Sequence, residues 1–123
     1  MKRRRKDWRT IKRSFGGRYE KERNEMKELK EAVKVLMHEE YERAAERFGE
    51  SFHSPHEAYA VIKEEAEEAQ NEMRYILGQM EAYWIRIKEN MITDGSLEVI
   101  EKTALNAACE CIQVAAMAYK ARR

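Results

Sequence analysis

Several glutamates gather in a stretch that the hydrophobic pattern predicts to be one helix. Glu65 falls between Ile62 and Ala69, inside the apolar stripe of that helix. Three more acids lie on the same side or at its edge: Glu64, Glu68 and Glu72. A carboxylate on an inward-facing stripe is costly unless something satisfies its charge. The spacing therefore predicts a charged site here rather than a plain core.

In the stretch from about 97 to 120, a few polar residues interrupt a mostly apolar pattern. From Ala104 to Ala118 it is apolar nearly all round and is expected to be buried, and its polar exceptions form one stripe: Asn106, Glu110 and Gln113. Clustered carboxylates cannot all stay ionised and buried without a cation. Oxygen ligands with no His or Cys beside them favour Mg²⁺ or Mn²⁺. Glu40 adds a third acid, inside the apolar stripe of the first predicted helix.

Two other interpretations of these acids stay open on spacing alone. The run 64–72 (EEAEEAQNE) has the composition of a solvated acidic face. Glu110 has two candidate ion-pair partners on the preceding helix, Arg74 and Arg86.

The elements that must position these acids are three helices, because only 5 Gly and 1 Pro interrupt the chain. We expect the first over about 18–48, ending at Gly49, and the second over about 55–90. Ser54, Pro55 and Glu57 form a helix start with a capping box, and Ser96 is the expected cap of the third helix, over about 97–120. The fold class is all-α, an antiparallel bundle of three long helices. Its thin core is expected to be completed by dimerisation.

The net charge of +1 hides a division of the chain. Residues 1–25 carry eleven Lys or Arg against four acids, which predicts a basic, flexible arm before a domain over 26–123. The remainder is acidic, so nucleic-acid binding is expected only through the arm. The sequence predicts a cytoplasmic protein without a membrane span or secretory leader. Cys109 and Cys111 are expected to be reduced core residues that cannot share one metal.

Residues 64–68 also carry a recognisable motif, EExxE, formed by Glu64, Glu65 and Glu68. With the segments LMHEEYERA, FHSPHEAYAVIKEE and ACECIQVAAMA, it makes residues 26–123 resemble the MazG-like, all-α nucleoside triphosphate pyrophosphohydrolases. The likeness is greatest to the small phage- and prophage-type members. It covers about four-fifths of the chain and excludes the basic arm.

This resemblance implies Mg²⁺-dependent cleavage between the α- and β-phosphates of a nucleotide, giving a nucleoside monophosphate and pyrophosphate, in a homodimer or homotetramer. It implies that Glu65 is the catalytic residue and that the metal ligands are Glu64, Glu65, Glu68, Glu110 and Asn106. The residues expected to contact the nucleotide are His53, His56, Glu40 and Gln113.

One half of the family's metal motif, ExxD on a later helix, is missing here. Depending on alignment, its place is taken by Asn106 and Cys109, Ala107 and Glu110, or Glu110 and Gln113. Each alignment loses at least one carboxylate. The sequence therefore leaves open whether the chain is an enzyme. The alternative is a non-catalytic nucleotide-binding or protein-interaction module of a phage, with a role against host defence.

Overall fold

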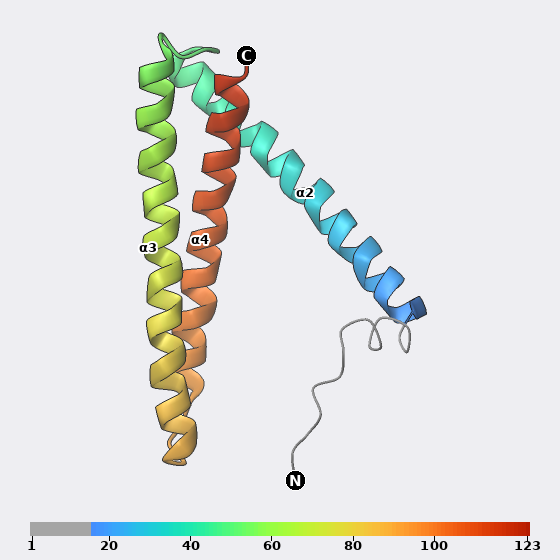
Figure 1. Cartoon of the computed structure of the whole chain (residues 1–123), viewed down its shortest axis with the longest axis vertical. Coiled ribbons are helices and arrows are strands. Elements are labelled where there is room, and N and C mark those ends of the chain that lie inside the picture. Colours follow the sequence, from blue (N-terminus) through green and yellow to red (C-terminus); the bar gives the residue numbers. More distant parts are fainter. Residues whose placement is uncertain (1–15) are drawn as a thin grey trace. The chain divides into compact units, whose positions relative to one another are not determined.

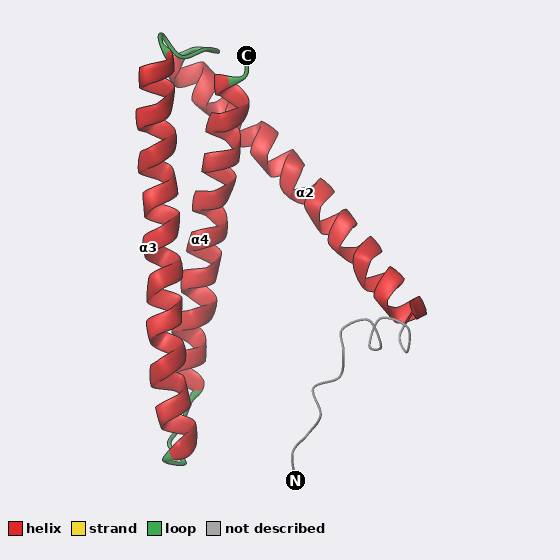
Figure 2. Cartoon of the chain, viewed as in Figure 1, coloured by secondary structure: helices red, strands yellow, loops and turns green. Residues whose placement is uncertain are grey.

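The computed structural model describes residues 16–123, and over this range it contains three α-helices and no strand. The helices are α2 (Gly16–Phe48), α3 (Pro55–Lys88) and α4 (Asp94–Ala121), shown in Figure 2. The prediction of an all-α fold is confirmed for this range. None of these helices combines the length and apolar character needed to cross a bilayer.

The chain divides into two units, and the second begins at Leu36. Helix α2 contributes to both, and the described part of the first unit is its segment 16–35. Exposed ion pairs line this segment, Arg18 with Glu22 at 3.4 Å and Lys34 with Glu31 at 3.3 Å. Of the predicted basic arm, residues 1–15 lie outside the described residues, and 16–25 belong to α2. The predicted domain start at Met26 therefore falls inside a continuous helix.

Helix α3 begins where the capping residues predict. The Ser54 hydroxyl accepts a hydrogen bond from the Glu57 N–H at 3.1 Å, and Pro55 occupies the first helical position. The Glu57 carboxylate in turn accepts from the His53 N–H at 3.3 Å. These bonds fix the residue at which α3 begins. They therefore also fix the face of the helix on which Glu65 lies, about three turns later.

Helix α4 begins earlier than predicted. Its first residue is Asp94, and the capping position belongs to Thr93, whose side chain makes no capping bond. The prediction that Ser96 caps this helix is wrong, because Ser96 is buried within the helix. Asp94 in the first turn supplies the negative charge that a helix N-terminus favours.

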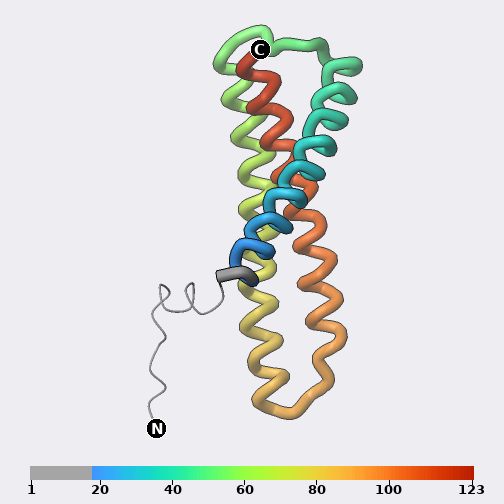
Figure 3. Tube along the Cα trace, turned by 90° about the vertical axis from the view of Figure 1, so that its right-hand side faces the viewer, coloured from blue at the N-terminus to red at the C-terminus, as the bar shows by residue number. Residues whose placement is uncertain are grey.

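Helices α3 and α4 run antiparallel and side by side (Figures 1 and 3). Eight buried or half-buried positions of α3 follow one another at intervals of three or four residues: Ala58, Ile62, Glu65, Ala69, Glu72, Ile76, Gln79 and Tyr83. Those of α4 include Ser96, Thr103, Ala107, Glu110 and Val114. The contact between the two helices, called the seam below, is thus made largely of small and polar residues.

The core of the described chain is correspondingly small. Its buried apolar residues are four alanines and Tyr41, and no large side chain is fully buried. The prediction that α4 is buried nearly all round is wrong, since Leu105 is 62% exposed. Cys109 and Cys111 are free but exposed rather than in a core. The reason is that α3 covers only one face of α4.

Aromatic contacts join the last turns of α2 to the end of α4. The Tyr119 ring meets Tyr41 edge-on at 4.9 Å between centroids and His38 at 5.1 Å. The Tyr41 hydroxyl donates to the Glu50 carbonyl at 3.2 Å. These contacts hold Glu40 and Phe48 beside α3 and α4, where they contribute to a pocket described below.

The cap of α3 gives a first testable prediction. Ser54→Ala leaves the Glu57 N–H without its acceptor, so the free energy of unfolding should fall by about 1 kcal/mol. Urea denaturation followed by circular dichroism measures it. Ser51→Ala, an exposed serine of the same loop, is the control and should change stability little. An equal loss in both variants would contradict a specific capping role.

Candidate metal centre

Three carboxylates converge across the seam. Glu65 and Glu68 come from α3 and Glu110 from α4, and each offers one oxygen within 4.8 Å of the others. Glu65 and Glu110 are half-buried, whereas Glu68 is exposed. Ala69 and Ala107, each about one turn from the cluster, are buried in the seam. Because alanine lets two helices approach closely, the seam brings the glutamates within reach of each other.

Gln113 links two of these carboxylates. With its amide oriented to satisfy its hydrogen bonds, its nitrogen donates to Glu65 Oε2 at 2.7 Å and to Glu110 Oε2 at 3.1 Å. A neutral amide adds no positive charge. Among residues 16–123, no ion pair includes any member of the cluster. The interpretation of Glu110 as a partner of Arg74 or Arg86 is therefore not what the structure shows.

Burial and mutual contact raise the pKa of all three carboxyls. For Glu65 the largest cause is burial, which outweighs the opposing hydrogen bond with Glu110, and the charges of Glu68, Glu64 and Glu40 raise the pKa further. Burial is also the largest cause of the raised pKa of Glu110; its hydrogen bond with Glu68 opposes the rise, whereas its hydrogen bond with Glu65 and the charges of Glu65 and Glu72 add to it. For Glu68 the main cause is its hydrogen bond with Glu110. The fully ionised cluster is thus unfavourable without a proton or a cation.

The donor set fits a hard divalent cation. Three carboxylates are a ligand set typical of Mg²⁺ and Mn²⁺. Oxygens around one Mg²⁺ lie about 3 to 4.2 Å apart, given metal–oxygen distances of about 2.1 Å. The 4.8 Å limit of this cluster is slightly wider. At least two of the three oxygen pairs would have to be neighbours around the ion, so binding it directly would draw these oxygens together by up to about 1.8 Å, and binding through a bridging water would need less.

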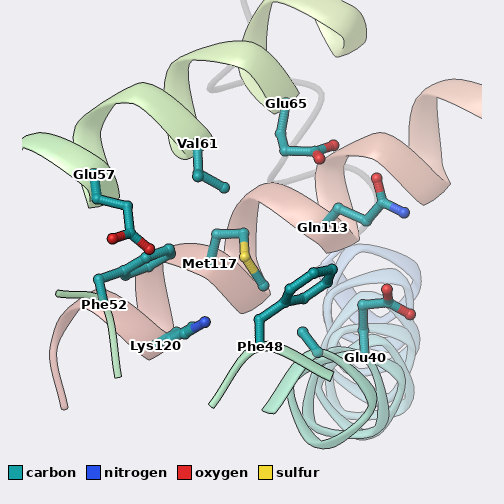
Figure 4. Close-up of a pocket in the computed structure, with 10 residues that line it drawn as sticks. Glu40, Phe48, Phe52, Glu57, Val61, Glu65, Gln113, Met117 and Lys120 are labelled. Atoms are coloured by element: carbon teal, nitrogen blue, oxygen red, sulfur yellow. The ribbon is translucent and has the colours of Figure 1, made fainter. Parts of the chain in front are cut away.

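A pocket of about 340 Å³ lies beside the cluster, within the second unit. Glu65 and Gln113 form one end, and Phe52, Glu57 and Lys120 form the other (Figure 4). Apolar side chains line the space between the ends: Ala44, Phe48, Val61 and Met117. Glu65 thus belongs to both the carboxylate cluster and the pocket wall.

Lys120 is the unusual group of this pocket. It is only 3% exposed, and its Nζ lies 4.4 Å from the centroid of the Phe52 ring. No ion pair of the described residues includes it. A cation–π contact stabilises an ammonium less than a carboxylate does when the site is desolvated. Its charge is therefore available to an anionic or carbonyl oxygen in the pocket.

The predicted site residues fall into two groups. Glu65, Glu68, Glu110 and Gln113 come together, and Glu40 lines the pocket while it pairs with Arg43 at 3.0 Å. Glu64 is exposed and acts on the cluster through its charge. Asn106 is exposed on α4, and no hydrogen bond of the described residues joins it to the cluster.

The two predicted histidines do not line this pocket. His53 is exposed and borders a separate cleft that also includes Lys120 and Arg123. His56 is exposed on the first turn of α3. Sequence reasoning missed Lys120 and Phe48 as pocket residues. The signal for Lys120 was present, because it continues the stripe of Glu110, Gln113 and Met117 at helical spacing.

Comparisons with models of protein families, with curated proteins and with solved structures found no match to this chain. The likeness to MazG-like pyrophosphohydrolases stays a prediction. The functional argument therefore depends on the residues and on their geometry.

The raised pKa values predict how stability depends on pH. Each carboxyl holds its proton more tightly in the folded chain than in the unfolded chain, where the pKa is near 4.5. This contribution is fully present below pH 4.5 and is lost as the pH rises through the folded-state values. In EDTA, the Tm should therefore fall with rising pH more steeply for the unmodified chain than for Glu65→Gln.

Thermal melts from about pH 4 to 8 measure this difference. Glu98→Gln, an exposed acid of α4 outside the cluster, is the matched control and should keep the steep slope. Identical slopes for Glu65→Gln and the unmodified chain would show that the cluster does not hold protons in the folded state.

Proposed function

We propose that this protein is a Mg²⁺-dependent nucleoside triphosphate pyrophosphohydrolase that releases a nucleoside monophosphate and pyrophosphate. The observation that carries the proposal is the convergence of Glu65, Glu68 and Glu110 within 4.8 Å at the end of a pocket. Clustered carboxylates with raised pKa values in a cleft are typical of functional sites. The EExxE resemblance gives this site its expected chemistry.

Glu65, Glu68 and Glu110 would hold the metal. A bound Mg²⁺ would neutralise charge on the phosphate oxygens and lower the pKa of water. Glu65 is suited to a second role, because it alone of the three also lines the pocket. From the pocket wall, its carboxylate would be placed to accept a proton from an attacking water. Gln113 would orient Glu65 through the 2.7 Å hydrogen bond.

The rest of the pocket suits a nucleoside. Its volume of about 340 Å³ lies in the range of small-molecule sites. With the triphosphate at the Glu65 end, the base would lie toward Phe48 and Phe52, whose rings offer flat apolar faces. The Lys120 ammonium would then donate to an exocyclic oxygen of the base. Because Lys120 has no ion pair to give up, this bond would add to affinity.

A second candidate function is a nucleotide-binding module without catalysis. The observation that favours it is that α4 contributes one carboxylate, Glu110, to the cluster. A site with three carboxylates would bind its ion more weakly than a site with more carboxylate ligands. The protein would then bind a nucleotide without hydrolysing it.

Release of pyrophosphate from a panel of canonical and modified NTPs and dNTPs, with Mg²⁺ or Mn²⁺, tests the proposal. Glu65→Gln should lower kcat by at least about 100-fold, because it removes both a ligand and the proton acceptor. Glu98→Gln should leave the rate unchanged. No turnover on any nucleotide by folded protein would contradict the enzyme, and calorimetric binding in that case would support the non-catalytic module.

The role of Lys120 is tested separately. Lys120→Met keeps an unbranched apolar stem of similar length but removes the charge. We expect KM to rise about tenfold or more, with a smaller change in kcat, because the lost contact is to the base rather than to the reacting phosphates. Lys102→Met, an exposed lysine of α4, is the control. A change confined to kcat would contradict a role in binding the base.

A further inference from the structure

Glu57 lies at the same end of the pocket as Lys120, away from Glu65 (Figure 4). The proposed function gives Lys120 a hydrogen bond to the base but gives Glu57 no role. Glu57 is half-buried and comes from the first turn of α3, whereas Lys120 comes from the last turn of α4. An acid and a base from two different helices thus border the space in which a nucleobase would lie.

Two hydrogen bonds hold Glu57 in place. Its Oε2 accepts from the His53 N–H at 3.3 Å, and its own N–H donates to the Ser54 hydroxyl at 3.1 Å. A carboxylate has about four acceptor sites, and the bond from His53 uses one of them. The side chain that fixes the start of α3 therefore also presents a held, acceptor-only group to the pocket.

Lys120 is the complementary group, because an ammonium donates hydrogen bonds and accepts none. The residue is 3% exposed, and its Nζ lies 4.4 Å from the centroid of the Phe52 ring. Within the described part of the chain, its side chain makes no hydrogen bond and no ion pair, and so none with Glu57. A desolvated cation requires an oxygen partner. A ligand that offered an acceptor to Lys120 and donors to Glu57 would satisfy both side chains.

We propose that the pocket selects guanine, with Lys120 donating to O6 and the Glu57 carboxylate accepting from N1–H and from the 2-amino group. This assignment deepens the proposed function and rests on it for the position of the phosphates near Glu65. The edge of guanine presents one acceptor followed by two donors, which matches a donor-only group beside a carboxylate with two oxygens. Phe48 and Phe52 supply apolar faces for the purine ring.

The other bases match the two side chains less fully. Hypoxanthine and uracil present an oxygen beside a single N–H, so one hydrogen bond to Glu57 is lost. Adenine in the orientation of guanine sets its amino group against the Lys120 ammonium and its N1 against the Glu57 carboxylate, which leaves both charges without a partner. A reversed adenine pairs both groups but makes one hydrogen bond fewer than guanine. Guanine is therefore the base with the most hydrogen bonds to this end of the pocket.

Calorimetry with GMP, IMP and AMP in Mg²⁺ tests the selection without turnover, because monophosphates are products of the proposed reaction. GMP should bind about tenfold more tightly than IMP, which lacks the 2-amino group, and at least about tenfold more tightly than AMP. Equal affinities for GMP and AMP, or no binding of GMP at about 5 mM, would overturn the selection.

The same titrations separate this selection from the proposed catalysis. Preference for GMP in a protein that hydrolyses no nucleotide would support the guanine site and contradict only the enzyme. Hydrolysis of several triphosphates, with equal affinities for GMP, IMP and AMP, would support the enzyme and overturn the guanine site.

Glu57→Gln tests the acceptor. Glutamine can still accept from the His53 N–H, since helix starts of this kind use Glu or Gln, so α3 should begin at the same residue. Its single oxygen cannot accept from both donors of guanine as well. The preference for GMP over IMP should therefore fall from about tenfold to within about twofold. Glu98→Gln, an exposed acid of α4, is the control and should keep the preference. An unchanged preference in Glu57→Gln would overturn the role of this carboxylate.

Lys120→Met tests the donor in the same titrations. GMP and IMP share O6, so loss of the ammonium should weaken both by a similar factor, about tenfold, and leave the ratio of their affinities unchanged. Circular dichroism checks that the variant keeps its helices. An unchanged affinity for GMP, or a ratio that falls as in Glu57→Gln, would overturn the assignment of Lys120 to O6.

Discussion

The close packing of α3 on α4 through small side chains is the constraint on which the site depends. Ala69 and Ala107 are both buried, about one turn from the glutamates. A larger side chain at either position would hold the helices apart. Glu65 would then lose the hydrogen bond that Gln113 donates to it across the seam. The distances between the acids therefore depend on two alanines that have no ligand or titratable group of their own.

The same constraint limits stability. Alanine buries little apolar area, and the seam also carries carboxyls whose charged form is disfavoured. The free energy of unfolding of a domain is only about 5–15 kcal/mol. A seam that buries so little apolar area therefore contributes little to the stability of the fold. Large apolar side chains of α3, such as Leu77 and Trp84, lie outside the seam and are exposed. A site built on a thin polar seam thus requires apolar burial elsewhere.

Much of this arrangement could be predicted from the sequence, and the exceptions share a physical cause. The capping residues placed the start of α3, and periodicity placed Glu65 and Glu110 on inward faces. Periodicity does not reveal which neighbour covers a face. Ala69 and Met73 are four residues apart, a spacing that fits one apolar stripe, yet Ala69 is buried in the seam and Met73 is exposed. Apolar content likewise predicted a buried α4, although some of its apolar side chains, such as Leu105, are exposed.

Lys120 was missed for a related reason, since a lysine near a chain end is usually a solvated residue. Along α4, the stripe that begins with Glu110 and Gln113 continues through Met117 to Lys120, so its character changes from acidic to apolar to basic. Gln113, Met117 and Lys120 form this side of the pocket wall in the same order, with Glu65 beside Gln113 and Glu57 near Lys120. A ligand that matched it would carry a cation-bound anionic group at one end and a neutral hydrogen-bond acceptor at the other. A metal-bound nucleotide has this distribution, whereas a simple acidic or basic metabolite would match only one end.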